Sequence, residues 1–258
     1  MITKRSSIMK KHILFFTFLI IVLKILGQKN KIFKSKISNE INFNSFKHLF
    51  ILSGQSNMVG LDPDESFIPI LEKKFGKERI IIIKDAKSGQ PIRRWNKNWK
   101  GKSFEIKDSI GNLYNSLINK VRKAVMNKKI KTVTFIWMQG ERDAREELAD
   151  YYEESLIDLY NQLTNDLKFK DINFLIGRIS DFDLLNISYK HWTRIRDIQV
   201  KVAESNIRFE WIDTDDLNDG INKKGIKIDN DLHYSDSGYK ILGQRFAEKA
   251  IKMINSMN

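Results

Sequence analysis

Cysteine is absent from the 258-residue sequence, and histidine is scarce, with only four residues. Without cysteine the chain can form no disulfide, zinc–thiolate site, thiol nucleophile or cysteine-linked lipid anchor. Export is still compatible with this composition, because a domain of this length builds a core without disulfides. The shortage of histidine leaves few candidates for a general base.

Signatures of metal and phosphate binding are also missing. The acidic stretch DTDDLNDG does not match a calcium loop, since Leu217 takes the third ligand position when Asp215 is the first. The stretch GINKKGIK does not match a phosphate loop, because Ile226 stands where lysine is required. We therefore predict a protein that needs no metal and no other cofactor.

Positive charge is in excess: 45 Lys and Arg residues oppose 32 Asp and Glu residues, for a formal net charge of +13. A basic protein can meet nucleic acid, anionic lipid or acidic glycans. The lysines of KKFGKERIIIIK and VRKAVMNKKIK are scattered rather than interleaved with exposed aromatic residues, as a base-stacking surface requires. We predict no nucleic-acid partner, whereas an acidic glycan would make use of the basic surface.

The first 28 residues have the pattern of a secretory signal peptide. Four Lys and Arg residues precede an apolar run at 13–23, which Lys24 interrupts. This run is shorter than the roughly 20 residues of a membrane span. The alternative is a retained N-terminal anchor, and only in that case do we expect contact with a membrane.

Residues 29–45 carry charge, Asn and Ser without sustained periodicity, which is typical of a tether. Residues 46–258 then form one domain. We expect the protein to be exported, as a periplasmic, cell-surface or secreted protein. The sequence carries no signal for its oligomeric state.

Apolar segments with strand and helix periodicity alternate along this domain. Strands are expected at His48–Leu52, Arg79–Lys84, Thr132–Met138, Ile172–Ile179 and Phe209–Thr214, and amphipathic helices at 110–125, 148–167 and 239–250. Apolar strands separated by amphipathic helices indicate βαβ crossovers and a parallel sheet covered on both faces. The sequence therefore predicts an α/β fold, a three-layer doubly wound sandwich with a mainly parallel five-stranded sheet.

Small polar residues follow the first predicted strand in HLFILSGQSNMVG, from His48 to Gly60. Ligands bind at the carboxyl ends of strands in such sheets, and Ser56 lies just beyond one of these ends. Ser56 is therefore either a nucleophile or an ordinary helix cap. Two further polar stretches follow later strands: Gly89 lies in DAKSGQPIRRW, and WMQGERD places Gln139 at the end of the third strand, where an amide donor would suit an oxyanion hole.

His233 is the best candidate for a general base. It lies in the loop IDNDLHYSDSGY, with acidic residues before it and a helix after it. His48 opens the first strand, at the end of the sheet opposite Ser56. His191 lies near a helix start and is most simply a surface or boundary residue. The fourth histidine, His12, is in the leader.

Four blocks together resemble a known family. GQSNM at 54–58, GQPIRRW at 89–95, WMQGERD at 137–143 and DLHYSDSGYKILGQRFAE at 231–248 are similar, in order and approximate spacing, to the blocks of SGNH-type carbohydrate esterases. The likeness is strongest to the sialate O-acetylesterase and acetylxylan esterase branch, and it covers about residues 47–253. It implies an SGNH, flavodoxin-like sheet and a serine esterase that acts on acetylated carbohydrate.

The resemblance also implies roles for individual residues. Ser56 is the nucleophile and His233 the base, while the oxyanion hole comes from the N–H groups of Ser56 and Gly89 and the amide of Gln139. The expected supporting polar network consists of Gln55, Asn57, Glu141, Asp143 and Asn230.

The sequence departs from the family at the third member of the triad. The Asp that the family places three residues before its His is Asn230 here, with Asp229 and Asp231 on either side. Three arrangements stay open. Asp231 could orient His233 through a shifted loop, or Asn230 could accept the ring N–H through its side-chain oxygen. In the third, a backbone carbonyl accepts the ring N–H in a Ser–His dyad. We favour Asp231, because a carboxylate also stabilises the imidazolium that forms during catalysis.

The expected reaction is ester hydrolysis through an acyl-serine, with an acetylated polysaccharide or sialylated, acidic glycan as substrate. Trp95 or Trp99 would stack on a sugar ring, and Arg93 or Arg94 would meet a carboxylate. Two alternatives stay open. One is a carbohydrate-binding protein that keeps the fold without turnover, and the other is a lipase-like, thioesterase-like or acyltransferase enzyme on the same scaffold.

Overall fold

The structure is a computed structural model that describes residues 24–31, 46–101 and 109–256. The chain divides into two units, Met1–Ser45 and Phe46–Asn258. In the first unit residues 24–31 are helical, and the predicted signal peptide and tether otherwise fall outside the described residues, so these assignments and export stay predictions. No helix in the described ranges is long and apolar enough to cross a membrane.

The second unit is built on a five-stranded sheet in which every neighbouring pair of strands is parallel. The strands are β1 (Phe46–Gly54), β2 (Ile80–Ala86), β3 (Lys129–Met138), β4 (Ile172–Gly177) and β5 (Phe209–Ile212), in the order β2-β1-β3-β4-β5. Each strand begins and ends within three residues of its predicted bounds. The order matches the doubly wound flavodoxin-like arrangement, which confirms the predicted fold class.

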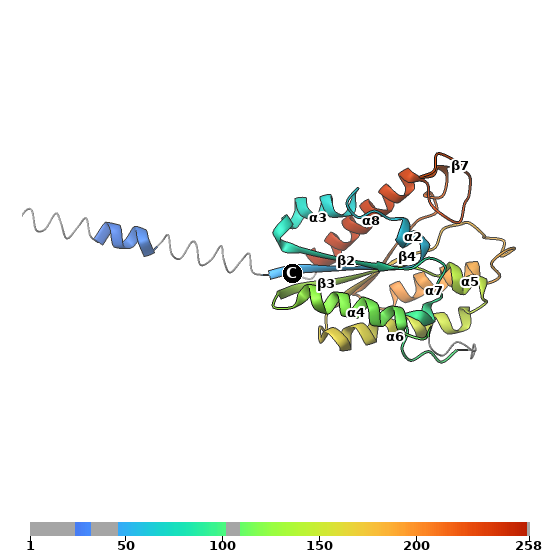
Figure 1. The fold of residues 1–258 in the computed structure, drawn as a ribbon, viewed down its shortest axis with the longest axis horizontal. Coiled ribbons are helices and arrows are strands. Elements are labelled where there is room, and N and C mark those ends of the chain that lie inside the picture. Colours follow the sequence, from blue (N-terminus) through green and yellow to red (C-terminus); the bar gives the residue numbers. More distant parts are fainter. Residues whose placement is uncertain (1–23, 32–45, 102–108, 257–258) are drawn as a thin grey trace, which may run out of the picture. The chain divides into compact units, whose positions relative to one another are not determined.

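Helices cover both faces of this sheet. On one side lie α3 (Phe67–Phe75) and α8 (Asp236–Asn255), which pack on each other, and on the other side lie α4 (Asn112–Val125), α6 (Ala149–Leu167) and α7 (Trp192–Glu204) (Figure 1). The apolar faces predicted at 110–125, 148–167 and 239–250 belong to α4, α6 and α8. The result is the expected three-layer sandwich.

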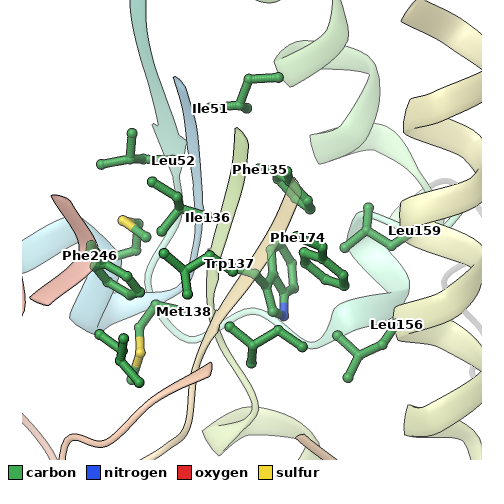
Figure 2. Close-up of a cluster of buried hydrophobic side chains, with 14 of the residues drawn as sticks. Ile51, Leu52, Phe135, Ile136, Trp137, Met138, Leu156, Leu159, Phe174 and Phe246 are labelled. Carbon is green, nitrogen blue, oxygen red and sulfur yellow. The ribbon is translucent and has the colours of Figure 1, made fainter. Parts of the chain in front are cut away.

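The core forms where the inner strands meet these helices. All six residues of β4 are buried, as a strand with helices on both faces requires. The rings of Phe135 and Phe174 stack with centroids 5.3 Å apart on neighbouring strands, and Trp137 packs beside them (Figure 2). Phe246 from α8 joins the same buried cluster (Figure 2).

Short elements occupy the carboxyl end of the sheet. The helices α2 (Ser56–Gly60) and α5 (Glu141–Arg145) follow β1 and β3 directly, and the 3-10 turn η2 (Ile92–Arg94) lies in the segment after β2. A two-stranded antiparallel hairpin, β6 (Gly220–Ile221) and β7 (Lys227–Ile228), precedes α8. A further 3-10 turn, η1 (Lys77–Arg79), leads into β2 from the opposite end. The polar segments singled out in the sequence therefore meet at one edge, where ligands bind in this class of sheet.

Candidate active site

Ser56 is the first residue of α2, immediately after β1. Gly54 ends the strand with a φ of +144°, and Gln55 turns the chain by donating its N–H to the carbonyl of Met138 at 2.9 Å. Ser56 itself is half-buried, and neither its hydroxyl nor its N–H donates to another described residue. Both groups are free to act on a ligand.

Asn57 connects the Ser56 helix to the His233 loop. Its amide Nδ2 donates to the carbonyl of Leu232 at 3.1 Å and to Oε1 of Glu141 at 2.9 Å, and its Oδ1 accepts from the hydroxyl of Tyr239 at 3.1 Å. The Asn57 side chain is buried, with 1% exposure. Because Asn57 is next to Ser56 and Leu232 is next to His233, this one amide ties the candidate nucleophile and base together.

Gly89 lies at an exposed turn after β2 with a φ of +68°, where glycine is favoured. Its N–H donates to no other described residue. The turn is fixed from both sides, since the carbonyl of Gln90 accepts from Nε2 of Gln139 at 3.1 Å and Ile92 N–H donates to Oδ2 of Asp143 at 2.9 Å. The N–H groups of Ser56 and Gly89 are the two backbone donors that the family resemblance implies for an oxyanion hole, and that role stays a prediction.

Gln139 is fully buried and braces the site from within. Its Nε2 donates to the carbonyl of Gln90, to Oδ2 of Asp143 and, at 3.3 Å, to Oε1 of Gln55. The hydroxyl of Tyr152 donates to its Oε1 at 3.1 Å. The amide hydrogens are therefore already engaged, so this geometry does not support the predicted use of Gln139 as an oxyanion donor.

Glu141 and Asp143 are both buried beneath these loops. Burial raises the pKa of Glu141 to about 7, although hydrogen bonds, including the one from Asn57, act to lower it. Burial also raises the pKa of Asp143 to about 7, although hydrogen bonds from Gln139 and Ile92 act to lower it. One oxygen of each carboxyl, Oε2 and Oδ1 respectively, has no hydrogen-bond partner. Their contacts fit a supporting network rather than direct proton transfer with a substrate.

His233 is partly exposed beside Asp231. Oδ1 of Asp231 accepts the backbone N–H of His233 at 2.8 Å and lies 3.8 Å from the ring Nδ1. Asp231 is thus next to the ring, although at a distance longer than a hydrogen bond. This proximity supports Asp231 as the residue that orients His233.

The Asn230 side chain is committed to other contacts. Its Oδ1 accepts from Nδ2 of Asn218 at 2.9 Å, and its Nδ2 donates to the carbonyl of Phe182 at 3.2 Å. The residue has a φ of +44°, in the left-handed region that Asn tolerates. Through these contacts the Asn230 side chain stabilises the loop that precedes His233, and it makes no hydrogen bond to the His233 ring.

His48 and His191 are structural. His48 is buried at the far end of β1 with Nδ1 2.7 Å from the Thr132 hydroxyl, and burial lowers its pKa to about 4. His191 precedes α7, and its Nδ1 accepts the N–H of Ala149 at 3.2 Å. Both outcomes agree with the sequence interpretation.

Three of the residues expected to contact a sugar are engaged within the protein. Trp95 is 1% exposed and packs edge-on against Trp137 at 5.2 Å between ring centroids, so stacking on a sugar is wrong for this residue. Arg93 forms an ion pair with Glu146 at 2.5 Å, and Arg94 donates to Gln90 at 2.6 Å. Their guanidinium groups hold the loop, which accounts for the basic pair without a substrate carboxylate.

Tyr239 is a site residue that the sequence interpretation missed. It contributed only to the apolar periodicity of the last helix, yet its hydroxyl reaches Asn57 and its ring lies against Gly60, where an added Cβ would be 2.3 Å from the ring. The spacing of a tyrosine on an amphipathic helix gave no signal of this contact.

In the described ranges no group of three His, Asp or Glu side chains is placed to hold a metal ion.

Comparisons with solved structures place the fold. A protein from Arabidopsis thaliana superposes with a TM-score of 0.60 at 17% identity, over 80% of this chain and 98% of the other. A novel carbohydrate acetylesterase from Xanthomonas citri superposes with a TM-score of 0.57 at 17% identity, over 78% of this chain and 54% of its own. The protein NanS gives 0.58 at 13% identity, over 82% and 98%. At these identities the likeness is one of fold.

Sequence comparison gives the family. No curated protein sequence matches the chain. Residues 59–252, more than half of the chain, match the family described as carbohydrate esterase, sialic acid-specific acetylesterase. This segment begins just after Ser56 and includes Gly89, Gln139 and His233, and it confirms the resemblance seen in the sequence blocks. The family supports esterase activity on acetylated carbohydrates, and the chain belongs to this family of carbohydrate esterases.

Proposed function

We propose that the protein is a serine esterase that removes O-acetyl groups from carbohydrate through an acyl-serine intermediate. The observation that carries the proposal is the Asn57 side chain, which hydrogen-bonds the carbonyl of Leu232 and so ties the half-buried Ser56 to the His233 loop. The free N–H groups of Ser56 and Gly89 support the same reading, because a developing oxyanion needs such donors.

The reaction proceeds in two halves. Ser56 Oγ attacks the acetyl carbonyl while His233 takes the hydroxyl proton, and the N–H groups of Ser56 and Gly89 donate to the oxyanion. His233 then returns the proton to the sugar oxygen, which leaves as an alcohol. A water molecule, deprotonated by the same ring, attacks the acyl-serine and releases acetate. Asp231 orients the ring and stabilises the imidazolium.

The test is acetate release from p-nitrophenyl acetate and acetylated xylan by the wild type, Ser56→Ala and His233→Ala. We expect each substitution to lower kcat by about 1000-fold or more, because both residues act in the same step. His191→Ala is the matched histidine control, since its ring contacts the scaffold, and it should keep kcat within about threefold of wild type. Full activity in Ser56→Ala would refute the serine mechanism.

A second candidate is a carbohydrate-binding protein that has lost turnover. Asn230 favours this alternative, because it stands where the family places its triad Asp and its side chain is engaged with Asn218 and Phe182. Binding of acetylated xylan without acetate release by the wild type would establish it. Faster cleavage of long-chain than of acetyl p-nitrophenyl esters would instead indicate a lipase-like enzyme.

A further inference from the structure

A cleft of about 570 Å³ lies beside the candidate active site, outside the residues assigned so far. Three of its walls are the tip of the β6–β7 hairpin, the start of α8 and the segment before α3. Figure 1 shows β7 beside one end of α8, and this end of α8 is the one nearer to α2. The lining residues are Glu65, Ile221, Asn222, Lys223, Asp236 and Ser237. The volume falls within the range of small-molecule sites.

Tyr239 separates this cleft from the candidate nucleophile. Lys223 Nζ lies 5.5 Å from the centre of the Tyr239 ring, and the hydroxyl of the same ring donates to Asn57, the neighbour of Ser56. On the other side, Asp236 and Ser237 follow His233 by three and four residues. Tyr239 therefore links the cleft to the Asn57 amide beside Ser56, and a short stretch of chain links Asp236 to His233.

The groups that line the cleft suit a ligand rich in hydroxyls. Glu65 and the Asp236 carboxylate are acceptors, while Lys223 and Nδ2 of Asn222 are donors without a hydrogen-bond partner among the described residues. Oδ1 of Asn222 accepts two backbone N–H groups of the hairpin, which fixes the direction of its amide. Ile221 adds an apolar surface that is 51% exposed.

The charges in the cleft decide between neutral and acidic sugars. Asp236 pairs with Lys240 at 3.0 Å, and Lys240 also interacts with Glu65, so the two carboxylates of the lining are balanced by Lys240 and Lys223. The lining therefore offers a ligand carboxylate no net positive charge. Sugar hydroxyls satisfy carboxylates and an ammonium equally well, because each hydroxyl both donates and accepts.

We propose that this cleft is a glycan subsite that binds an uncharged sugar unit next to the acetylated one. The proposal rests on the proposed esterase function and deepens it. It assigns the selection of an uncharged, extended substrate to the β6–β7 hairpin. The sequence leaves an acetylated polysaccharide and a sialylated, acidic glycan open as substrates, and the lining of the cleft favours an uncharged unit at the β6–β7 hairpin.

The test compares kcat/KM for acetylated xylo-oligosaccharides with kcat/KM for p-nitrophenyl acetate, which has no second sugar. In Lys223→Ala and Glu65→Ala the ratio of the first to the second should fall about tenfold, the effect of one lost hydrogen bond to a charged group. Lys224→Ala is the matched control, because Lys224 lies on the same hairpin but does not line the cleft. An unchanged ratio in both cleft variants would overturn the proposal.

Two further measurements separate this proposal from the esterase function. Calorimetric titration of the full chain with unacetylated xylo-oligosaccharide reports binding without turnover, and Lys223→Ala should weaken it about tenfold. Binding without any esterase activity would remove the proposed function and keep the subsite. Higher kcat/KM on an acetylated xylo-oligosaccharide whose neighbouring unit carries a uronic acid than on the uncharged oligosaccharide would overturn the assignment to an uncharged sugar.

Discussion

The side chain of Asn57 makes three hydrogen bonds to parts of the chain that are far apart in the sequence. Its partner Tyr239 is 182 residues away, and Leu232 is 175 residues away. Because the amide is buried, each of these bonds is protected from competition with water. The orientation of one amide therefore sets where the His233 loop lies relative to Ser56.

We predict that Tyr239→Phe lowers kcat for p-nitrophenyl acetate about tenfold with little change in KM. The substitution keeps the ring but leaves the buried Oδ1 of Asn57 without its donor, which costs about 1–3 kcal/mol and frees the amide to turn away from Leu232. A loss of about 1.4 kcal/mol of transition-state stabilisation corresponds to tenfold in rate. Steady-state kinetics with thermal unfolding of the same samples measures both effects.

Tyr234→Phe is the matched control. Its hydroxyl is also buried and donates to the Thr214 hydroxyl at 2.9 Å, and its ring lies 5.5 Å from that of Tyr239. It should lower the unfolding temperature as much as Tyr239→Phe does, while kcat stays within about twofold. Equal loss of kcat in both variants would mean that Tyr239 is only a packing residue.

The difference between Ser56 and Tyr239 shows what sequence reasoning could find at this scale. Ser56 and His233 lie in blocks that resemble a known family in order and spacing, and that resemblance indicated them, whereas the residues around Ser56 alone left a helix cap open. Tyr239 lies among apolar residues at helical spacing, which predict only a buried face. Its role depends on a contact across 182 residues, and no local pattern encodes that contact.

At the scale of elements, the strands were predictable because each is a short apolar run buried between two layers of helices. The helix α3 was not predicted, since its nine residues FIPILEKKF are too few to establish a period. The β6–β7 hairpin was missed as well, because each of its strands has only two residues. The strand order could not be read either, since periodicity does not say which strands are neighbours.

The end of β1 supports an element-scale prediction on Gly54. A Cβ added there would lie 1.9 Å from the carbonyl oxygen of Met138 on β3, which is backbone and cannot move aside cheaply. Gly54 also has a φ of +144°. We expect Gly54→Ala to reduce the free energy of unfolding by more than about 3 kcal/mol, from steric overlap and backbone strain together. Urea denaturation followed by circular dichroism measures it.

Gly76→Ala isolates the contribution of backbone strain. Gly76 ends α3 with a φ of +90°, and an added Cβ would meet no atom within 4 Å. This control should lose only about 1 kcal/mol. Equal losses in the two variants would show that the close approach of β1 to β3 does not constrain the turn into Ser56.

At the scale of the whole molecule, the candidate active site is assembled over two buried carboxyl groups. Glu141 and Asp143 are within 1% of complete burial, and burial raises the pKa of each to about 7. A carboxyl whose pKa is higher in the folded than in the unfolded state binds its proton more tightly when folded. Its contribution to folding is therefore greatest at low pH and is lost as the pH rises toward the folded-state pKa.

We predict that the contribution of Glu141 to the free energy of unfolding is lost as the pH rises, and a comparison of wild type with Glu141→Gln isolates it. The ordinary pKa of this carboxyl is 4.5, and its pKa in the folded protein is about 7. The free energy of unfolding of wild type, relative to that of the variant, should therefore fall between pH 4.5 and 7 and level off above pH 7. One unit of pKa corresponds to 1.36 kcal/mol, which sets the total fall at up to about 3 kcal/mol. Urea denaturation at half-unit steps of pH measures it.

Glutamine is the right replacement, because its side-chain oxygen can still accept from Nδ2 of Asn57 while carrying no titratable proton. Asp143 and every other titrating group are present in both proteins, so their contributions cancel in the difference. A difference that stays flat from pH 4.5 to 7, or that rises with pH, would mean that Glu141 is ionised in the folded protein. In that case the network under Ser56 and His233 would hold a buried negative charge, and a positively charged or water-mediated partner for Oε2 would have to be found.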